Sequence, residues 1–149
     1  MKNVDTAEEK GYDAGKKVFG IKRHIFVDIN GLPHAISVTT ANVSDRDGAI
    51  QTIKENQEAL IQVKNLLVDG GYRGEAFALN VKSIMDATVE VVKRNELHTF
   101  KVLPKRWVVE RSFGWLEKCR RLWKNCERKL HTSLQMVVFV FVRLLLKRY

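Results

Sequence analysis

The chain has 149 residues, of which 45% are hydrophobic, enough for one domain with a buried core. Its 26 lysines and arginines exceed its 17 acidic residues, which gives a formal net charge of +9. Such an excess favours a polyanionic partner, because each cation that neutralises a phosphate releases condensed counterions. A basic structural or ribosome-associated protein carries a similar charge, so composition alone leaves that alternative open.

Two features of the sequence argue against secretion and membrane insertion. The first ten residues, MKNVDTAEEK, are polar and acidic, unlike a signal peptide. The most apolar stretch, 134–146, would span about 20 Å as a helix, short of the roughly 30 Å hydrocarbon core of a bilayer. We therefore expect a soluble, cytoplasmic protein in which this stretch is a buried core helix.

The first expected element is a β-hairpin. Residues 1–15 are expected to be loosely ordered, and residues 16–149 to form the folded domain. The run 17–29 is rich in β-branched and aromatic residues and predicts a strand. Asn30-Gly31 then favours a type I′ turn, in which both central residues need a positive φ. The return strand is expected over 34–40.

Helices and strands alternate in the rest of the chain. Ser44 and Asp47 form an approximate capping box, which predicts a helix that runs to about residue 63. A strand over 65–68, a helix over 75–85, a strand over 88–92, a long helix over 105–127 and a final helix from about 133 follow. This order is typical of an α/β sheet covered by helices.

Asp69 lies where the strand 65–68 ends and a Gly-Gly turn begins. In α/β sheets, ligands collect beyond the carboxyl ends of strands, where a short acidic side chain can point into a crevice. The two glycines let the backbone turn sharply and let a bulky ligand approach. A purely turn-forming aspartate is the alternative, since Asp-Gly is common in turns.

Glu110 lies on the predicted helix 105–127, which has two distinct stripes. The stripe expected to face the core is apolar: Val109, Phe113, Leu116, Cys119, Trp123 and Cys126. The other is charged around one glycine: Arg106, Glu110, Gly114, Glu117, Arg121 and Lys124. A carboxylate among guanidinium groups could hold a divalent metal against a phosphate backbone. The alternative is a solvated face with Arg106–Glu110 and Glu117–Arg121 ion pairs.

The predicted hairpin is also basic. It carries Lys16, Lys17, Lys22 and Arg23, which could follow a phosphate backbone or, equally, guard a solvated edge strand.

Three segments resemble a known family in their order and spacing: GYDAGKKVFGIKRHIFVD, LLVDGGYRGEAF and LPKRWVVERSFGWLEKCRRL. They are similar to the C-terminal catalytic portion of IS5-type transposases, a branch of the IS4/IS5 superfamily of DDE insertion-sequence transposases. The resemblance covers nearly the whole chain from about residue 11. It implies an RNase H-like fold, in which a mixed sheet is flanked by helices.

The resemblance implies a metal-dependent active site. Family members use two Asp and one Glu to bind two divalent ions, normally Mg²⁺ with Mn²⁺ as a substitute. Asp69 corresponds to the second Asp and Glu110 to the Glu, so both are expected to be catalytic metal ligands. Arg106 corresponds to the Arg four positions before the Glu. Glu117 stands where a related signature has Lys, with Lys118 beside it.

The resemblance also implies DNA as the partner. The expected reaction is cleavage at the ends of an insertion sequence, followed by strand transfer into target DNA by a homo-multimer on paired ends. Five basic side chains are expected to contact DNA: Arg106, Arg111, Lys118, Arg120 and Arg121.

The chain departs from the family pattern at the first catalytic Asp. That residue lies on a first, central strand upstream of the GYDAGKK block, and no strand is predicted before Lys17. We expect the sheet to lack this strand, with strand edges exposed on both sides, and the lone chain to be catalytically incomplete. Asp28, at the end of a predicted strand, is a better placed substitute than Asp5 or Asp13. The alternatives are a catalytically inactive DNA-binding remnant or inhibitor, and an RNase H-like nuclease without strand transfer.

Overall fold

Five strands and five α-helices make up the described part of the computed structural model, residues 7–92 and 106–147. In chain order they are β1 (Gly11–Asp13), β2 (Val18–Val27), β3 (Pro33–Thr40), α1 (Asp45–Glu55), α2 (Gln57–Leu60), β4 (Asn65–Val68), α3 (Glu75–Met85), β5 (Thr88–Val91), α4 (Arg106–Glu117) and α5 (Leu130–Leu146). Two 3-10 turns, η1 (Gly70–Tyr72) and η2 (Arg120–Leu122), join them.

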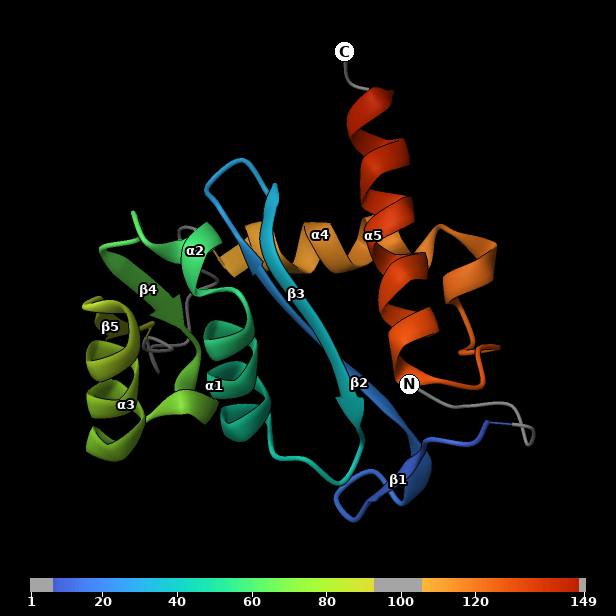
Figure 1. Ribbon diagram of the computed structural model, residues 1–149, viewed down its shortest axis with the longest axis horizontal. Coiled ribbons are helices and arrows are strands. Elements are labelled where there is room, and N and C mark those ends of the chain that lie inside the picture. Colours follow the sequence, from blue (N-terminus) through green and yellow to red (C-terminus); the bar gives the residue numbers. More distant parts are fainter. Residues whose placement is uncertain (1–6, 93–105, 148–149) are drawn as a thin grey trace, which may run out of the picture.

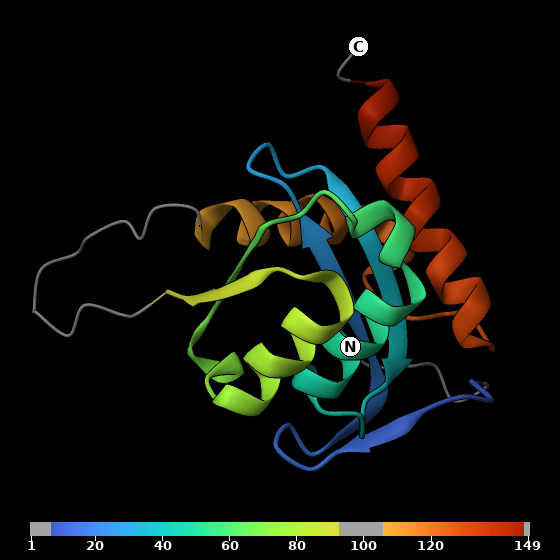
Figure 2. The same cartoon turned by 60° about the vertical axis from the view of Figure 1, so that its left-hand side comes forward.

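The β2–β3 hairpin forms the middle of three layers. Phe26 and Ala35 pack into a core that α1, α2 and α3 complete, whereas Ile25 and Ile36 pack against α4 and α5. Neighbouring residues face opposite cores because side chains alternate along a strand. Figures 1 and 2 both show α1 and α4 on opposite faces of the hairpin. The expected α/β class is confirmed.

The described strands form two sheets, not the one mixed sheet that we expected. Strands β1, β2 and β3 make an antiparallel sheet in that order, and β4 pairs with β5 in parallel. No described strand joins β2 to β4, so the two sheets meet without hydrogen-bonded pairing between them.

Several predicted elements agree closely with the structure. The strand over 65–68 and the helix over 75–85 have the expected bounds as β4 and α3. Ser44 Oγ accepts a hydrogen bond from Asp47 N at 3.1 Å, so the predicted cap begins α1. That helix ends at Glu55, and α2 continues to Leu60 after a break at Asn56.

The hairpin is confirmed, but its predicted turn type is wrong. Gly31 has φ +82°, whereas Asn30 is not among the residues with positive φ. Gly31 N donates to Asp28 O at 3.0 Å, and Asp28 N donates to Leu32 O at 3.0 Å. Ile29, Asn30 and Gly31 therefore form a three-residue connection, in which only the last residue needs the left-handed region.

A strand precedes Lys17, contrary to expectation. Residues 11–13 form β1 and pair with Phe19 and its two neighbours in β2. Upstream of it, Ala7 is buried, and the Glu8 amide donates to Arg128 O at 3.1 Å. Part of the segment expected to be loosely ordered is thus tied to the fold by long-range contacts.

The predicted helix 105–127 is wrong beyond Glu117. Cys119 has an extended backbone with ψ 110°, and η2 follows it. This change of direction buries Leu122 against α5, and Arg23 Nη2 donates to Leu122 O at 3.1 Å. The predicted apolar stripe therefore breaks up: Leu116 is fully buried, Trp123 is 79% exposed and Cys126 is exposed.

Helix α5 matches the expected core helix on one face only. Val137, Val140 and Phe141 are buried, whereas Phe139 and Val142 on the same helix are exposed. No helix in the described ranges is both long and apolar enough to cross a membrane.

Buried His24 makes stability depend on pH. Its Nε2 lies 2.9 Å from Thr39 Oγ1, and burial lowers the pKa of the ring, with Asp45 opposing this effect. The unfolded chain therefore takes up a proton near pH 6.5 that the folded chain resists. We expect the free energy of unfolding to fall as pH drops below about 6.5. Urea titrations at pH 7.5 and 5.0 measure this, and an equal pH dependence in His24→Gln would contradict the assignment.

Candidate active site

A cleft of about 1370 Å³ lies where the two sheets meet. It is lined by β2, by β4 with the turn that follows it, and by one face of α4. The N-terminal residue of α1, Asp45, also reaches it. The cleft is therefore the place where loop and helix side chains from distant parts of the chain come together.

Asp69 lies at the carboxyl end of β4 and lines this cleft. Its Oδ1 accepts a hydrogen bond from Gly71 N at 2.9 Å and so caps η1. The same turn is held from α1, where Arg46 Nε donates to Gly71 O at 2.9 Å. Asp69 is exposed, and among the described residues its Oδ2 makes no hydrogen bond. Asp69 therefore has the turn-forming role that was the alternative prediction, but this role uses only its Oδ1.

Tyr72 stands beside Asp69 and was missed in the sequence. Burial, together with the charges of Asp45 and Asp69, raises the pKa of its hydroxyl to about 12. Asp45 is itself paired with Lys22, whose Nζ lies 3.1 Å from Asp45 Oδ1. Tyr72 therefore stays protonated at neutral pH and is a hydrogen-bond donor at the edge of an acidic site.

Glu110 lines the same cleft, although it lies about 40 residues further along the chain, on α4. It is exposed near the start of α4 and lines the cleft together with Asp69. One turn further on, a Cβ added to Gly114 would meet no atom within 4 Å, so this stretch of the helix surface is open. The structure thus brings the two predicted acidic residues to one surface.

The candidates for a third carboxylate are placed differently. Asp28 lines the cleft, but its Oδ1 accepts from Asn30 N at 2.8 Å and Leu32 N at 3.0 Å. Burial raises the pKa of Asp28, but these bonds and His34 outweigh it and lower the pKa. Asp13 caps a turn outside the cleft, and Asp5 lies outside the described residues. Within those residues, no three His, Cys, Asp or Glu side chains gather closely enough to hold a metal ion.

Comparison with known proteins identifies the family. The pattern described as "Transposase DDE domain" matches residues 2–145. The chain belongs to this family. It is also 32% identical over 119 residues to a Burkholderia cepacia protein named as a transposase for insertion sequence element IS402. That alignment covers 74% of the chain and 55% of the relative, so the chain spans about half of the relative's length. No solved structure matches.

DDE transposases act on DNA and generally use divalent metal ions. The cleft is lined by five acidic residues, Asp28, Asp45, Asp69, Glu110 and Glu117, and by basic side chains of β2 and of the turn after η1. Of these basic residues, Lys22 and Arg23 were singled out in the sequence, whereas Arg73 was missed because nothing in its local pattern distinguishes it.

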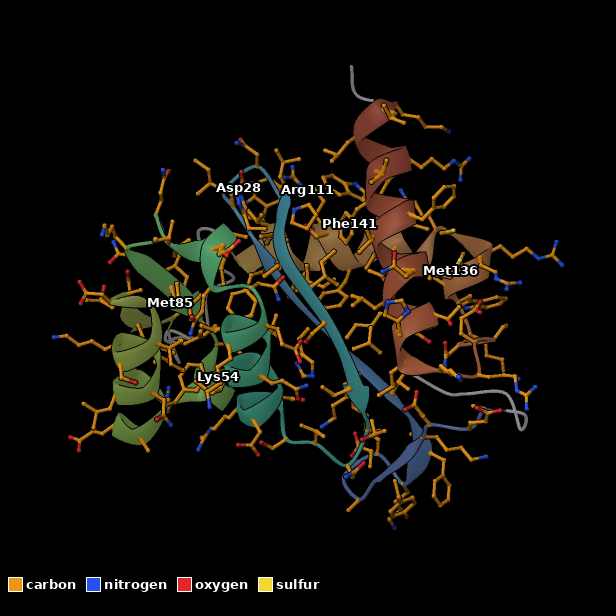
Figure 3. The ribbon with its side chains drawn as sticks, in the orientation of Figure 1. Asp28, Lys54, Met85, Arg111, Met136 and Phe141 are labelled. Carbon is orange, nitrogen blue, oxygen red and sulfur yellow. The ribbon has the colours of Figure 1, made fainter. Side chains whose placement is uncertain are left out.

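Arg111, one of the predicted DNA contacts, makes contacts within the protein. Its Nη2 donates to Asn30 O at 2.7 Å, and its guanidinium lies over the rings of Trp107 and Trp115 at 4.3 Å and 4.9 Å. Figure 3 shows its side chain close to Asp28 at the tip of the hairpin. This arrangement fastens α4 to the β2–β3 connection.

Of the other predicted DNA contacts, three follow the end of α4, and the side chain of the fourth lies outside the described residues. Arg106 is the first residue of α4, and its side chain lies outside the described residues. Lys118 and Arg120 are exposed beyond Glu117 and do not line the cleft. Arg121 Nη2 pairs with Glu127 Oε1 at 2.8 Å and not with Glu117, because the helix has already ended.

Proposed function

We propose that this chain forms part of an RNase H-like catalytic domain of a DNA transposase and supplies two of its metal-binding carboxylates. The observation that carries the proposal is the convergence of Asp69 and Glu110 on one cleft. Asp69 stands at the carboxyl end of a parallel strand, the usual position for a ligand-binding acid in an α/β sheet.

The two carboxylates suit a hard divalent cation. Mg²⁺ prefers oxygen ligands, keeps several waters and is commonly held by one or two carboxylates together with substrate phosphates. In this proposal, Asp69 through its Oδ2 and Glu110, which lines the same cleft, would be the two protein ligands of one ion. A second ion, as in the two-ion site of the family, needs further oxygens from DNA or from another carboxylate. When bound, such ions activate the attacking hydroxyl and stabilise the leaving oxygen.

The chain's own residues bind and orient the DNA backbone. The protonated Tyr72 hydroxyl can donate to a phosphate oxygen, and nearby Arg73 offsets the charge that develops during phosphoryl transfer. In the proposed reactions, water attacks the phosphorus at the end of the element and releases a 3′-hydroxyl. That hydroxyl then attacks a phosphate of target DNA, in a homo-multimer that holds both ends.

Metal-dependent DNA cleavage tests the proposal. The purified chain is incubated with supercoiled DNA and Mg²⁺ or Mn²⁺, and with pre-cut ends plus target DNA. A transposase gives nicked DNA in the first reaction and joined products in the second. Cleavage without joined products would instead identify an RNase H-like nuclease.

A second candidate is a DNA-binding chain that does not cut. It is favoured by one observation, namely that among the described residues no three His, Cys, Asp or Glu side chains gather closely enough to hold a metal ion. In the same assays this chain would bind DNA with steep salt dependence and leave supercoiled DNA intact with either metal.

Different basic residues are expected to serve DNA binding and folding. In a Lys118→Ala/Arg120→Ala variant, affinity for duplex DNA should fall uniformly across sequences. The slope of log K against log salt should decrease by about 1–2, one unit for each lost phosphate contact. Fluorescence anisotropy at several salt concentrations measures both.

Arg111→Ala is the contrasting variant. It should lower the free energy of unfolding by about 1–2 kcal/mol, because it removes the contacts with both tryptophans and the bond to Asn30 O. If Arg111→Ala left stability unchanged and lowered DNA affinity more than Lys118→Ala/Arg120→Ala does, Arg111 would be the DNA contact and the assignments would be reversed.

A further inference from the structure

Two aromatic side chains are exposed together where β1 pairs with β2. Tyr12 and Phe19 are direct cross-strand partners, and their ring centroids lie 5.0 Å apart at an interplanar angle of 52°. Tyr12 is 46% exposed and Phe19 is 59% exposed. Figures 1 and 2 both show β1 at an end of β2 that extends beyond the helices. The two rings therefore form an aromatic surface that is largely open to solvent.

The exposure of Phe19 follows from the place where the helical layer ends. Side chains alternate along a strand, so Phe19 faces the same way as Ile21 and Ile25. Ile21 is fully buried, and Ile25 packs against the layer of α4 and α5. Phe19 lies one step nearer the start of β2, beyond that layer. A cross-strand aromatic pair contributes only modestly to stability, so replacing one ring should leave the chain folded.

Two lysines stand in the turn that joins β1 to β2. Lys16 and Lys17 are both exposed, and Lys17 has φ +51°. Among the described residues, no ion pair engages the ammonium group of either lysine. Lys16 also lines the cleft that contains Asp69 and Glu110. The β1–β2 hairpin therefore presents positive charge between its two aromatic rings and the candidate active site.

The acidic groups nearest this turn already have partners within the protein. Asp13 Oδ1 accepts a hydrogen bond from Lys16 N at 3.0 Å. Upstream of β1, Glu8 forms an ion pair at 2.6 Å, and Glu9 Oε2 accepts a hydrogen bond from a backbone amide at 2.7 Å. The lysine charges of the turn are thus available to an anion from outside. Lysines can also protect an edge strand such as β1, but that protection gains nothing from two exposed rings.

We propose that the β1–β2 hairpin binds single-stranded DNA. An unpaired base stacks on the rings of Tyr12 and Phe19, and the neighbouring phosphates lie against Lys16 and Lys17. Every base has a π-face that an aromatic ring can stack on, and a basic surface beside such rings follows the backbone. The bases of a duplex are stacked on one another, so the rings select unpaired DNA, whereas lysines alone bind both forms. The inference goes beyond the proposed chemistry and needs neither Asp69 nor a metal ion.

Fluorescence anisotropy with labelled DNA, measured without divalent metal, tests the proposal. The probes are an oligothymidylate of about twelve nucleotides and a duplex of the same length, within the range of known single-strand sites. In Phe19→Ala, affinity for the single strand should fall at least about fivefold, the lower end of the cost of losing a stacked ring. Affinity for the duplex should change less than about twofold, because paired bases do not reach the rings. Phe139→Ala removes a ring that is 64% exposed on α5 and should change neither affinity.

Further variants separate stacking, apolar contact and charge. Leucine keeps an apolar side chain but cannot stack, so Phe19→Leu should lose single-strand affinity as Phe19→Ala does, whereas Phe19→Trp should retain or raise it. Asparagine readily adopts a positive φ, so Lys17→Asn removes the charge and preserves the turn. Its slope of log K against log salt for the single strand should decrease by about 0.7, the value for one phosphate contact. Thermal midpoints from circular dichroism show that each variant is folded.

Two results would overturn the proposal. Unchanged single-strand affinity in a folded Phe19→Ala or Phe19→Leu chain would show that no base stacks on the rings. Equal losses of affinity for the single strand and the duplex would show that the β1–β2 hairpin binds duplex DNA instead. Neither result bears on metal-dependent cleavage, which is measured separately. An Asp69→Asn chain should bind the oligothymidylate at least as tightly as the parent chain does, so failure of the proposed function leaves this inference intact.

Discussion

Replacing Asp69 by asparagine is expected to lower metal-dependent DNA cleavage by at least about 100-fold. Loss of a group that merely supports a metal ligand typically costs 10–100-fold in metal affinity or activity, so loss of a direct ligand should cost more. Asparagine keeps a side-chain oxygen that can accept the hydrogen bond from Gly71 N, so the turn that caps η1 should survive. The variant therefore removes the charge while preserving the local structure.

Asp86→Asn is the matched control for Asp69→Asn. Asp86 is exposed at the end of α3, and its φ of +51° is one that asparagine tolerates well. This change removes one negative charge from the chain but lies outside the cleft lining. Full cleavage by Asp86→Asn and loss in Asp69→Asn would locate the effect in the cleft.

Mn²⁺ binding gives a second readout that does not require turnover. The concentration of free Mn²⁺ in a titration, followed by electron paramagnetic resonance, should show weaker binding by Asp69→Asn and by Glu110→Gln. Glu58→Gln, an exposed change in α2 away from the cleft, is the control for the glutamate. Equal Mn²⁺ affinity in all these variants and the parent chain would remove Asp69 and Glu110 from the metal site.

Gly48→Ala is expected to destabilise the chain by about 1–3 kcal/mol, the usual cost of overpacking a core. A Cβ at Gly48 would overlap the ring of His24, which is 7% exposed and held by Thr39. From helix propensity alone, alanine in place of this glycine of α1 would stabilise the chain by about 0.5–1 kcal/mol. The sign of the change in unfolding free energy therefore tests the close packing of α1 on β2.

Gly114→Ala is the control for the glycine prediction. Gly114 also lies within a helix, but no atom lies within 4 Å of the added Cβ, so we expect a gain of about 0.4–1 kcal/mol. Combining Gly48→Ala with His24→Ala should cost at least about 0.5 kcal/mol less than the sum of the single changes, because both act on one contact. Urea unfolding of the parent, the three single variants and the double variant gives these free energies. Additive effects of Gly48→Ala and His24→Ala would show that the strain does not arise from contact between these two residues.

Local patterns in the sequence were sufficient for much of the fold. Strand β4 and helix α3 have the predicted bounds, because the periodicity of their apolar residues agrees with the burial of these residues in the fold. The cap at Ser44 was also predictable, because a capping hydrogen bond spans only three residues. In the candidate site, the position of Asp69 at a strand end was also predictable, because the strand and the Gly-Gly turn that follows it are adjacent in the sequence.

Other features depend on contacts between residues far apart in the chain. The end of α4 has no proline or glycine signal, and it is the burial of Leu122 against α5 that redirects the chain. Strand β1 is too short to show a period, and it forms because β2 offers it an edge. Tyr72 was missed because only burial beside Asp45 and Asp69 changes its chemistry.

The sequence by itself determined the α/β class, the family resemblance and the two acidic residues of the candidate site, since each is encoded within a short segment. Only the tertiary structure decided that Asp69 and Glu110 line one cleft and that Arg111 fastens the hairpin. It also decided that β2 and β4 border the cleft without pairing to each other. The reason is physical: a backbone edge is unpaired or paired according to what lies beside it, and short-range patterns carry no information about that neighbour.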